Sequence, residues 1–258
     1  GEVISISGAI DDSLKYLRRA EGLLVSALKS APQDADIAFE LASRRESIAD
    51  RLAGVGTGKP LDEAQAIRDY ESCRATWRDM LSWPGLAPEF RTRATRANAV
   101  VLAKLGNLDL ARERYAQAIA HHREARTVIS TLDRAARESL TSIRTQIMIL
   151  KGEGYALLWS GKPHEAMTIF AEALALGRQL VARDTQNEQN QSGLMSLLSA
   201  IGDAAQALNR PADAQAAWKE AEQIAVAMLA RDPANAIAKT RLDDIRAKLA
   251  GPVPPSPL

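Results

Sequence analysis

Apolar and small residues recur every three or four positions along most of the chain, which is the spacing of an amphipathic helix. No stretch alternates apolar and polar residues cleanly enough to predict a strand. Turn-forming residues interrupt the pattern at 31–36, 54–60, 83–88, 105–107, 161–163, 209–211 and 231–235. The pattern therefore predicts an all-α chain of about ten helices. The expected bounds are 11–29, 34–55, 61–82, 87–105, 107–130, 133–160, 163–183, 187–208, 211–231 and 234–249.

Proline, glycine and asparagine mark where some of these helices begin and end. Pro163 and Pro211 each precede an alanine-rich run. Proline suits the first helical turn because its fixed φ matches the helix and its missing N–H would have no partner there. Gly161 and Asn209 stand two residues earlier and are typical of helix ends in the left-handed conformation. Both stretches therefore predict a helix end, a turn and a new helix.

The two ends of the chain lack the helical pattern. We expect residues 1–10 to be a linker or disordered, and the proline-rich tail GPVPPSPL at 251–258 to be disordered. Residues 11–250 are expected to form a single domain. Because the chain begins with Gly1 rather than methionine, we interpret it as a part excised from a longer protein.

A pattern of small and large residues recurs at a distance of 48 residues. In its clear copies a glycine is followed by an alanine, a large aromatic residue and a second alanine. The two clear copies are Gly154, Ala166, Phe170, Ala173 and Gly202, Ala214, Trp218, Ala221. Weaker copies contain Ala111, Tyr115, Ala118 and Ala66, Tyr70, Cys73. Such a period predicts stacked antiparallel helix pairs, in which small residues let the backbones approach and the large ring fills the space between them.

At these residues the chain resembles the tetratricopeptide repeat family, whose signature is a small residue in the first helix and then alanine, an aromatic residue and alanine in the second. The resemblance extends from about residue 11 to residue 250 and implies a right-handed superhelical α-solenoid. One feature departs from the family. Pro233 follows Ala221 by twelve residues, and Thr185 takes the same place after Ala173. The second helices are therefore expected to be about three turns longer than usual.

A narrower resemblance is to the C-terminal tetratricopeptide arrays of large bacterial Ser/Thr kinases or regulators. It rests on FELASRRESIADRLAG at 39–54 and GKPLDEAQAIRDYESC at 58–73. It implies that a domain upstream of this chain carries the chemistry of the longer protein.

Charge is unevenly distributed. The net charge is +1, yet residues 91–151 hold 12 Lys and Arg against 5 Asp and Glu, between mildly acidic flanks. Such a segment suits an acidic partner, whereas nucleic acid is disfavoured because aromatic residues are not interleaved with the charge. Cys73 is the single cysteine, so no intramolecular disulfide can form. No signal peptide and no apolar run of membrane-spanning length is visible in the sequence.

No set of residues predicts catalysis, a metal or a cofactor. AGVGTGKP at 53–60 resembles a phosphate-binding loop, but Pro60 stands where a hydroxyl should reach Mg²⁺, so we interpret it as a glycine-rich turn. His121 and His122 are adjacent and face different ways on a helix, and no ligand cluster joins them. Cys73 replaces a repeat alanine and is expected to be a small buried residue. We therefore expect no enzyme activity.

The resemblance implies that the first helix of each pair lines a concave face. The third pair would present Arg93, Arg96, Val100 and Lys104, and the fourth Met148, Lys151, Tyr155 and Trp159. Arginine and aromatic residues dominate binding hot spots, so we expect one groove that binds a protein or peptide. The alternative is that Trp159 packs on the next helix and the arginines are solvated. Val100 stands where the family's clamp for peptide carboxyl termini has asparagine, so that mode of binding is not expected.

The expected function is a non-catalytic protein-interaction module of a larger bacterial signalling or regulatory protein. Alternatives are a scaffold that forms a homodimer or senses a signal for a missing catalytic domain, and nucleic-acid binding through the basic segment. The cytoplasm is the favoured compartment, although a membrane anchor upstream in the parent protein would place the chain outside it.

Overall fold

The structure is a computed structural model that describes residues 2–55 and 60–251, with side chains from residue 12 onward. Throughout these ranges every regular element is an α-helix and no strand occurs, which confirms the predicted all-α class. A single domain over residues 11–250 stays a prediction. The helices divide into two compact units, one of residues 1–112 and 123–137 and the other of residues 113–122 and 138–258.

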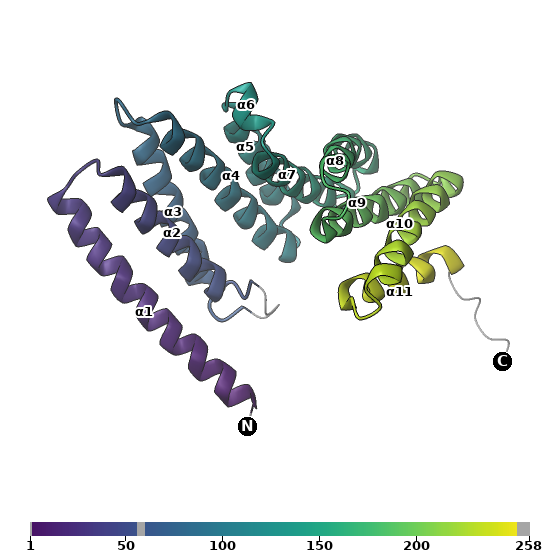
Figure 1. Cartoon of the computed structure of the whole chain (residues 1–258), viewed down its shortest axis with the longest axis horizontal. Coiled ribbons are helices and arrows are strands. Elements are labelled where there is room, and N and C mark those ends of the chain that lie inside the picture. The colour runs from purple at the N-terminus through teal and green to yellow at the C-terminus, as the bar shows by residue number, and fades with distance from the viewer. Residues whose placement is uncertain (1, 56–59, 252–258) are drawn as a thin grey trace. The chain divides into compact units, whose positions relative to one another are not determined.

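The first unit is a row of four long helices. They are α1 (Glu2–Ser30), α2 (Ala35–Leu52), α3 (Glu63–Ser82) and α4 (Pro88–Ala111), together with the short α6 (Arg134–Arg137). Each of the four long helices packs against the next one along the chain, and α2 also contacts α4 (Figure 1). Helix α5 (Tyr115–Ser130) is divided between the units, so that its residues from Arg123 onward belong to the first.

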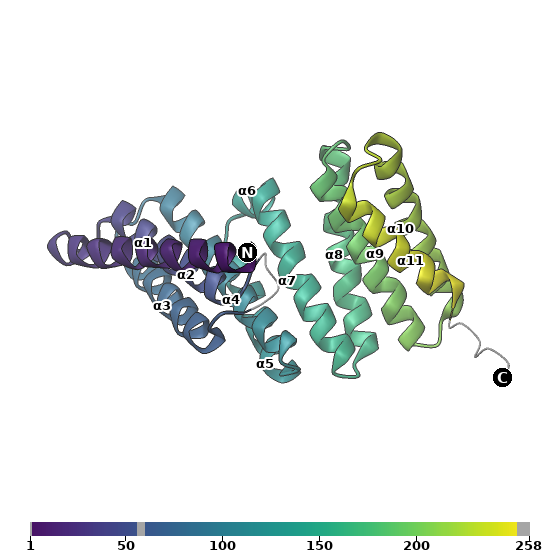
Figure 2. The ribbon, with the colours of Figure 1, turned by 90° about the horizontal axis from the view of Figure 1, so that it is seen from below.

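The second unit continues the same arrangement. Its helices are α7 (Leu140–Trp159), α8 (Pro163–Arg183), α9 (Glu188–Ala207), α10 (Pro211–Arg231) and α11 (Ala236–Ala250). Neighbours along the chain pack together (Figure 2), and contacts also join α7 to α9 and α9 to α11. Alternate helices therefore share a face, as in the stacked helix pairs of a solenoid. The handedness of the predicted superhelix stays a prediction.

Capping residues account for the positions of the helix ends. The side chains of Asp34, Asp62, Ser139, Asn187 and Asn235 each accept a hydrogen bond from a backbone N–H in the first turn. Pro163 and Pro211 occupy the first helical turn as predicted. Gly161 (φ 78°) and Asn209 (φ 56°) have the left-handed conformation of helix ends.

Three predicted boundaries are wrong. Helix α1 begins at Glu2, so the backbone from residue 2 to residue 10 is helical rather than a linker. Helix α4 runs through the expected turn at 105–107 and ends at Ala111. The helix predicted at 133–160 is interrupted, because the side chain of Ser139 caps a new helix there. The predicted disordered tail, from residue 252, and residues 56–59 of the glycine-rich turn lie outside the described residues.

The core of most repeats is as predicted. The small and large residues of three copies are buried. They are Ala66, Tyr70, Cys73, then Gly154, Ala166, Phe170, Ala173, and Gly202, Ala214, Trp218, Ala221. A Cβ atom on Gly154 would lie 2.4 Å from Cε1 of Phe170, and one on Gly202 would lie 2.1 Å from Nε1 of Trp218. The rings therefore rest directly on helix backbone that only glycine leaves open.

The copy built on Ala111 and Tyr115 is wrong. Ala111 is exposed at the end of α4, and Tyr115 is only partly buried at the start of α5. The glycine in the expected turn, Gly106, instead lies buried inside α4. Counting 48 residues back from Gly154 and Phe170 gives Gly106 and His122, and Ala118 retains a place in this corrected copy. His122 therefore takes the position that an aromatic ring has in the other copies.

His122 is fully buried, and its ring rests on the backbone of another glycine. A Cβ atom on Gly152 of α7 would lie 2.2 Å from Cε1 of the ring. Both ring nitrogens lack a hydrogen-bond partner among the described residues. Burial, with a smaller contribution from His121, lowers the pKa of His122 from 6.5 to about 4.

We predict that Gly202→Ala destabilises the fold by about 1–3 kcal/mol, because the new methyl group displaces the Trp218 ring from a packed site. Gly193→Ala is the matched control, since Gly193 lies on the same helix with nothing within 4 Å of its added Cβ. Alanine should stabilise α9 there by up to about 1 kcal/mol. Denaturant unfolding of both variants gives the comparison, and equal effects at the two glycines would contradict the close contact.

We predict that His122 makes the fold sensitive to mild acid. The unfolded chain takes up the His122 proton near pH 6.5 and the folded chain only near pH 4, so stability falls as the pH drops through this window. Between pH 7 and pH 5 the wild type should lose about 2 kcal/mol more than His122→Phe. Urea unfolding of both proteins at the two pH values measures this difference, and parallel pH profiles would argue against a buried neutral imidazole.

Candidate functional site

The predicted groove residues of α4 lie in the first unit and have different environments. The guanidinium carbon of Arg93 lies 3.9 Å from the centroid of the Phe39 ring, so this arginine packs on α2 by a cation–π contact. Arg96 is half-buried, and no described residue forms a hydrogen bond or ion pair with it. Burial lowers the pKa of Arg96, and Arg93 adds to this effect. Val100 is partly buried.

Lys104 is not a free groove residue, contrary to our expectation. Its Nζ donates to Glu46 Oε1 at 2.7 Å and to both carboxylate oxygens of Asp50 at 2.7 Å. Asp50 also accepts a hydrogen bond of 2.6 Å from the Tyr70 hydroxyl. Burial alone would lower the pKa of Lys104, but the carboxylates of Glu46 and Asp50 outweigh it and raise the pKa. The cluster joins α2, α3 and α4, so its role is structural.

The predicted groove residues of α7 lie in the second unit on one stripe of the helix. Lys151, Tyr155 and Trp159 are four residues apart, which places them on the same face. The Tyr155 ring centroid lies 5.3 Å from that of Trp159 and 5.4 Å from that of Phe170. Trp159 is 53% exposed, whereas Tyr155 is half-buried. Tyr155 thus connects a core ring to a surface ring.

Lys151 is a half-buried cation with no hydrogen bond or ion pair to any described residue. Burial lowers its pKa, and the positive charge of Arg241 on α11 adds to this effect. Within the basic segment 91–151, Arg96 and Lys151 are the residues without an attractive partner in the described part of the chain. The other basic residues of the segment each take part in a hydrogen bond, ion pair, ring contact or electrostatic interaction.

Lys151 and Met148 line a cavity of about 230 Å³ among α7, α8 and α9. Two of its polar residues, Arg144 and Asn190, were not identified from the sequence. Arg144 donates from Nε at 3.3 Å and from Nη2 at 3.2 Å to Oδ1 of Asn190. These residues are 46 positions apart and meet only through the packing of α7 on α9. No sequence signal would have paired them.

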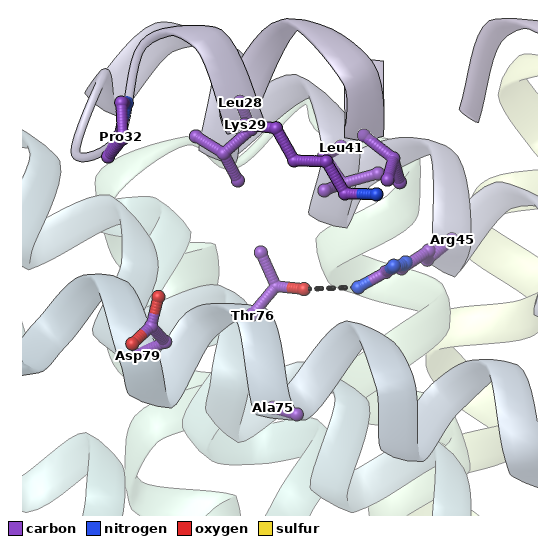
Figure 3. Close-up of a pocket in the computed structure, with 9 residues that line it drawn as sticks. Leu28, Lys29, Pro32, Leu41, Arg45, Ala75, Thr76 and Asp79 are labelled. Atoms are coloured by element: carbon purple, nitrogen blue, oxygen red, sulfur yellow. Dashed lines mark hydrogen bonds between the residues drawn. The ribbon is translucent and has the colours of Figure 1, made fainter. Parts of the chain in front are cut away.

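A second hollow, of about 500 Å³, lies in the first unit between α1 and α3 (Figure 3). Leu28, Leu41 and Pro32 contribute apolar surface, and the Arg45 guanidinium donates to the Thr76 hydroxyl at 2.7 Å. Arg45 also pairs with Glu21 at 3.0 Å. Arg45 therefore already links α1, α2 and α3.

The predicted single groove needs the α4 and α7 stripes side by side. The two stripes belong to different compact units, so a shared groove stays a prediction. In the described part of the chain no three His, Cys, Asp or Glu residues are grouped to hold a metal ion. Cys73 is buried as expected, its thiol donates to the Ala42 carbonyl at 3.1 Å, and burial raises its pKa. None of the described helices has the length and apolarity to cross a membrane.

Comparisons with known proteins show similarity of fold. No family model and no curated protein matches the chain. Among solved structures, the chain is similar to the crystal structure of BtubC (BKLC) from P. vanneervenii, with 15% sequence identity and a TM-score of 0.53. The match covers 97% of this chain and 95% of that chain. At this level of identity the similarity supports the helical fold alone.

We predict that Lys104→Met destabilises the first unit by about 2 kcal/mol, because Glu46 and Asp50 lose the cation that neutralises them. Lys15→Met is the matched control, since the Lys15–Asp12 pair is exposed and should contribute less than about 0.5 kcal/mol. Denaturant unfolding measures both changes. Adding Asp50→Asn to Lys104→Met should recover part of the loss, and the absence of any loss in Lys104→Met would show that the cluster is not structural.

Proposed function

We propose that the chain is a non-catalytic, tetratricopeptide-like interaction module of a larger bacterial signalling or regulatory protein. The α7 face of the second unit binds an acidic segment of a partner protein. The observation that carries this proposal is Lys151, a half-buried cation without an anionic partner, on the same stripe of α7 as the exposed ring of Trp159, about two turns away. Leaving a cation partly desolvated costs free energy, which a carboxylate of a partner would recover.

The aromatic residues support contact with a protein. The Tyr155 ring contacts both the Trp159 ring and the buried Phe170 ring, so the exposed ring packs against residues that are anchored in the core. A pre-positioned aromatic side chain contributes contact area at a small entropic cost, which is why tryptophan is enriched in binding hot spots.

The pairing of the basic segment speaks against nucleic acid. Lys104 is neutralised by Glu46 and Asp50, and Arg112 pairs with Glu63 at 2.7 Å. A surface that binds phosphate backbone needs many cations free to release counterions. A few unpaired cations beside an aromatic ring suit a short acidic peptide better.

The test is selection of a random-peptide library on the immobilised chain, followed by fluorescence polarisation with the enriched peptides. We predict that these peptides are acidic. Lys151→Gln and Trp159→Ala should each weaken binding at least about tenfold, since each removes a contact of about 1.4 kcal/mol. Lys219→Gln, which removes an exposed lysine of α10 in the same unit, is the matched control and should bind as the wild type does.

Circular dichroism must first show that each variant keeps its helices. Enrichment of no sequence class, or enriched peptides that bind Lys151→Gln as tightly as the wild type, would refute the proposed surface. A loss of affinity as salt rises would agree with it, because exposed charges are screened beyond about 10 Å at 0.1 M salt.

The alternative of a dimerisation scaffold is favoured by a separate observation on α1. Tyr16 is 74% exposed and Leu23 is 67% exposed, and their spacing of seven residues places both on one face of the helix. A second copy that covered this face would produce a dimer. Sedimentation velocity over a wide concentration range, before and after Tyr16→Lys and Leu23→Lys, separates this function from peptide binding at α7.

A further inference from the structure

The cavity among α7, α8 and α9 combines cationic groups with apolar walls inside one unit. Helices α7, α8 and α9 all belong to the second unit, so the geometry of the cavity does not depend on the placement of the units. Its volume is about 230 Å³. The lining residues are Arg144, Ile147, Met148, Lys151, Gly177, Leu180, Gln189, Asn190, Gly193, Leu194 and Leu197.

One buried donor in this lining has no partner. Asn190 is 5% exposed, and its Nδ2 forms no hydrogen bond with any described residue. The orientation of the amide follows from Arg144, which can only donate and which contacts the other atom, Oδ1. A buried N–H without an acceptor destabilises a fold, so the unpaired Nδ2 adds to the excess of hydrogen-bond donors around the cavity.

The charges around the cavity favour an anion. The described residues that line it include Arg144 and Lys151 but no aspartate or glutamate. Arg241 on α11 adds positive charge near Lys151. Gln189 and Asn190 belong to the first turn of α9, where the helix dipole also favours negative charge.

The apolar residues that line the cavity determine which uncharged part of a ligand fits it. Ile147, Met148 and Leu194 are apolar and partly or fully buried, and the buried side chains of Leu180 and Leu197 also line the cavity. Gly193 adds open space, because nothing lies within 4 Å of a Cβ built on it. A phosphate ion would leave these walls without contact, whereas a carboxylate on a short branched aliphatic chain fills them.

We propose that this cavity binds a carboxylate carried on a short aliphatic chain, with the carboxylate at Lys151 Nζ and the chain against Met148 and Leu194. Two sources supply this chemistry, a free aliphatic acid and the acidic side chain of a peptide. If the ligand is a free aliphatic acid, the inference is independent of the proposed function. If the ligand is an acidic peptide side chain, the inference rests on the proposed function and names the group that the peptide inserts beside the α7 stripe.

Isothermal titration with 4-methylpentanoate, and with 4-methylpentanamide as the neutral isostere, tests the site directly. We expect saturable binding of the acid and at least about tenfold weaker binding of the amide, because the amide lacks the charge that Lys151 recognises. Lys151→Met should weaken binding of the acid to a similar extent, and Asn190→Leu should weaken it severalfold. Lys219→Met removes the same charge elsewhere in the unit and should leave binding unchanged.

A variant that fills the cavity tests the site without removing any charged group. Gly193→Leu places a side chain in the open space of the cavity and replaces a helix-weakening residue, so the protein should fold and lose binding of the acid. Equal affinities for acid and amide, or unchanged affinity in both Lys151→Met and Gly193→Leu, would overturn the assignment. Complete absence of binding by both compounds would also overturn the free-acid source.

Competition then separates the two sources. Displacement of a selected acidic peptide by 4-methylpentanoate would show that the peptide inserts a carboxylate into this cavity. Binding of the acid without displacement would keep the cavity as a site for free acids and place the peptide elsewhere on the α7 face. If Gly193→Leu no longer binds the selected peptide and the wild type does not bind the free acid, the cavity is assigned to the peptide side chain.

Discussion

The close approach of a ring to a bare helix backbone determines how this chain packs. Phe170 rests on Gly154, Trp218 on Gly202 and His122 on Gly152, in each case where a single methyl group would clash. The ring fixes the distance between two helices, and its shape fixes their rotation. Because each contact repeats at nearly the same place along its helix, α7 and α9 present equivalent faces next to each other.

The same contacts determine what α7 presents at its surface. Gly152 and Gly154 face neighbouring rings, which leaves Lys151, Tyr155 and Trp159 on another stripe of the helix. Tyr155 lies between the Phe170 ring of the core and the Trp159 ring of the surface. The core therefore orients an exposed aromatic residue, so the binding surface proposed here would lose little conformational entropy when a partner binds.

The sequence predicted helices and core residues well, because both follow from periodicity and from capping residues. It failed where one residue type has two structural uses. Gly106 was taken for a turn residue, yet it packs inside α4, and Tyr115 was then chosen as the large residue in place of His122. The regular interval of 48 residues between Gly106, Gly154 and Gly202 was the available signal. Arg144 and Asn190 had none, because their contact exists only after α7 and α9 pack.

Cations between alternate helices are elsewhere neutralised within the same unit, which makes Lys151 informative. Lys104 of α4 pairs with Glu46 and Asp50 of α2, and Lys248 of α11 pairs with Asp203 of α9 at 2.7 Å. Both pairs join helices that share a face, so in these two places a lysine pairs with a carboxylate two helices earlier in the chain and links that face. Lys151 of α7 has Arg241 as its charged neighbour instead. Lys151 therefore differs from the two lysines that link alternate helices, and this difference supports the proposal that it binds an anion from a partner or ligand.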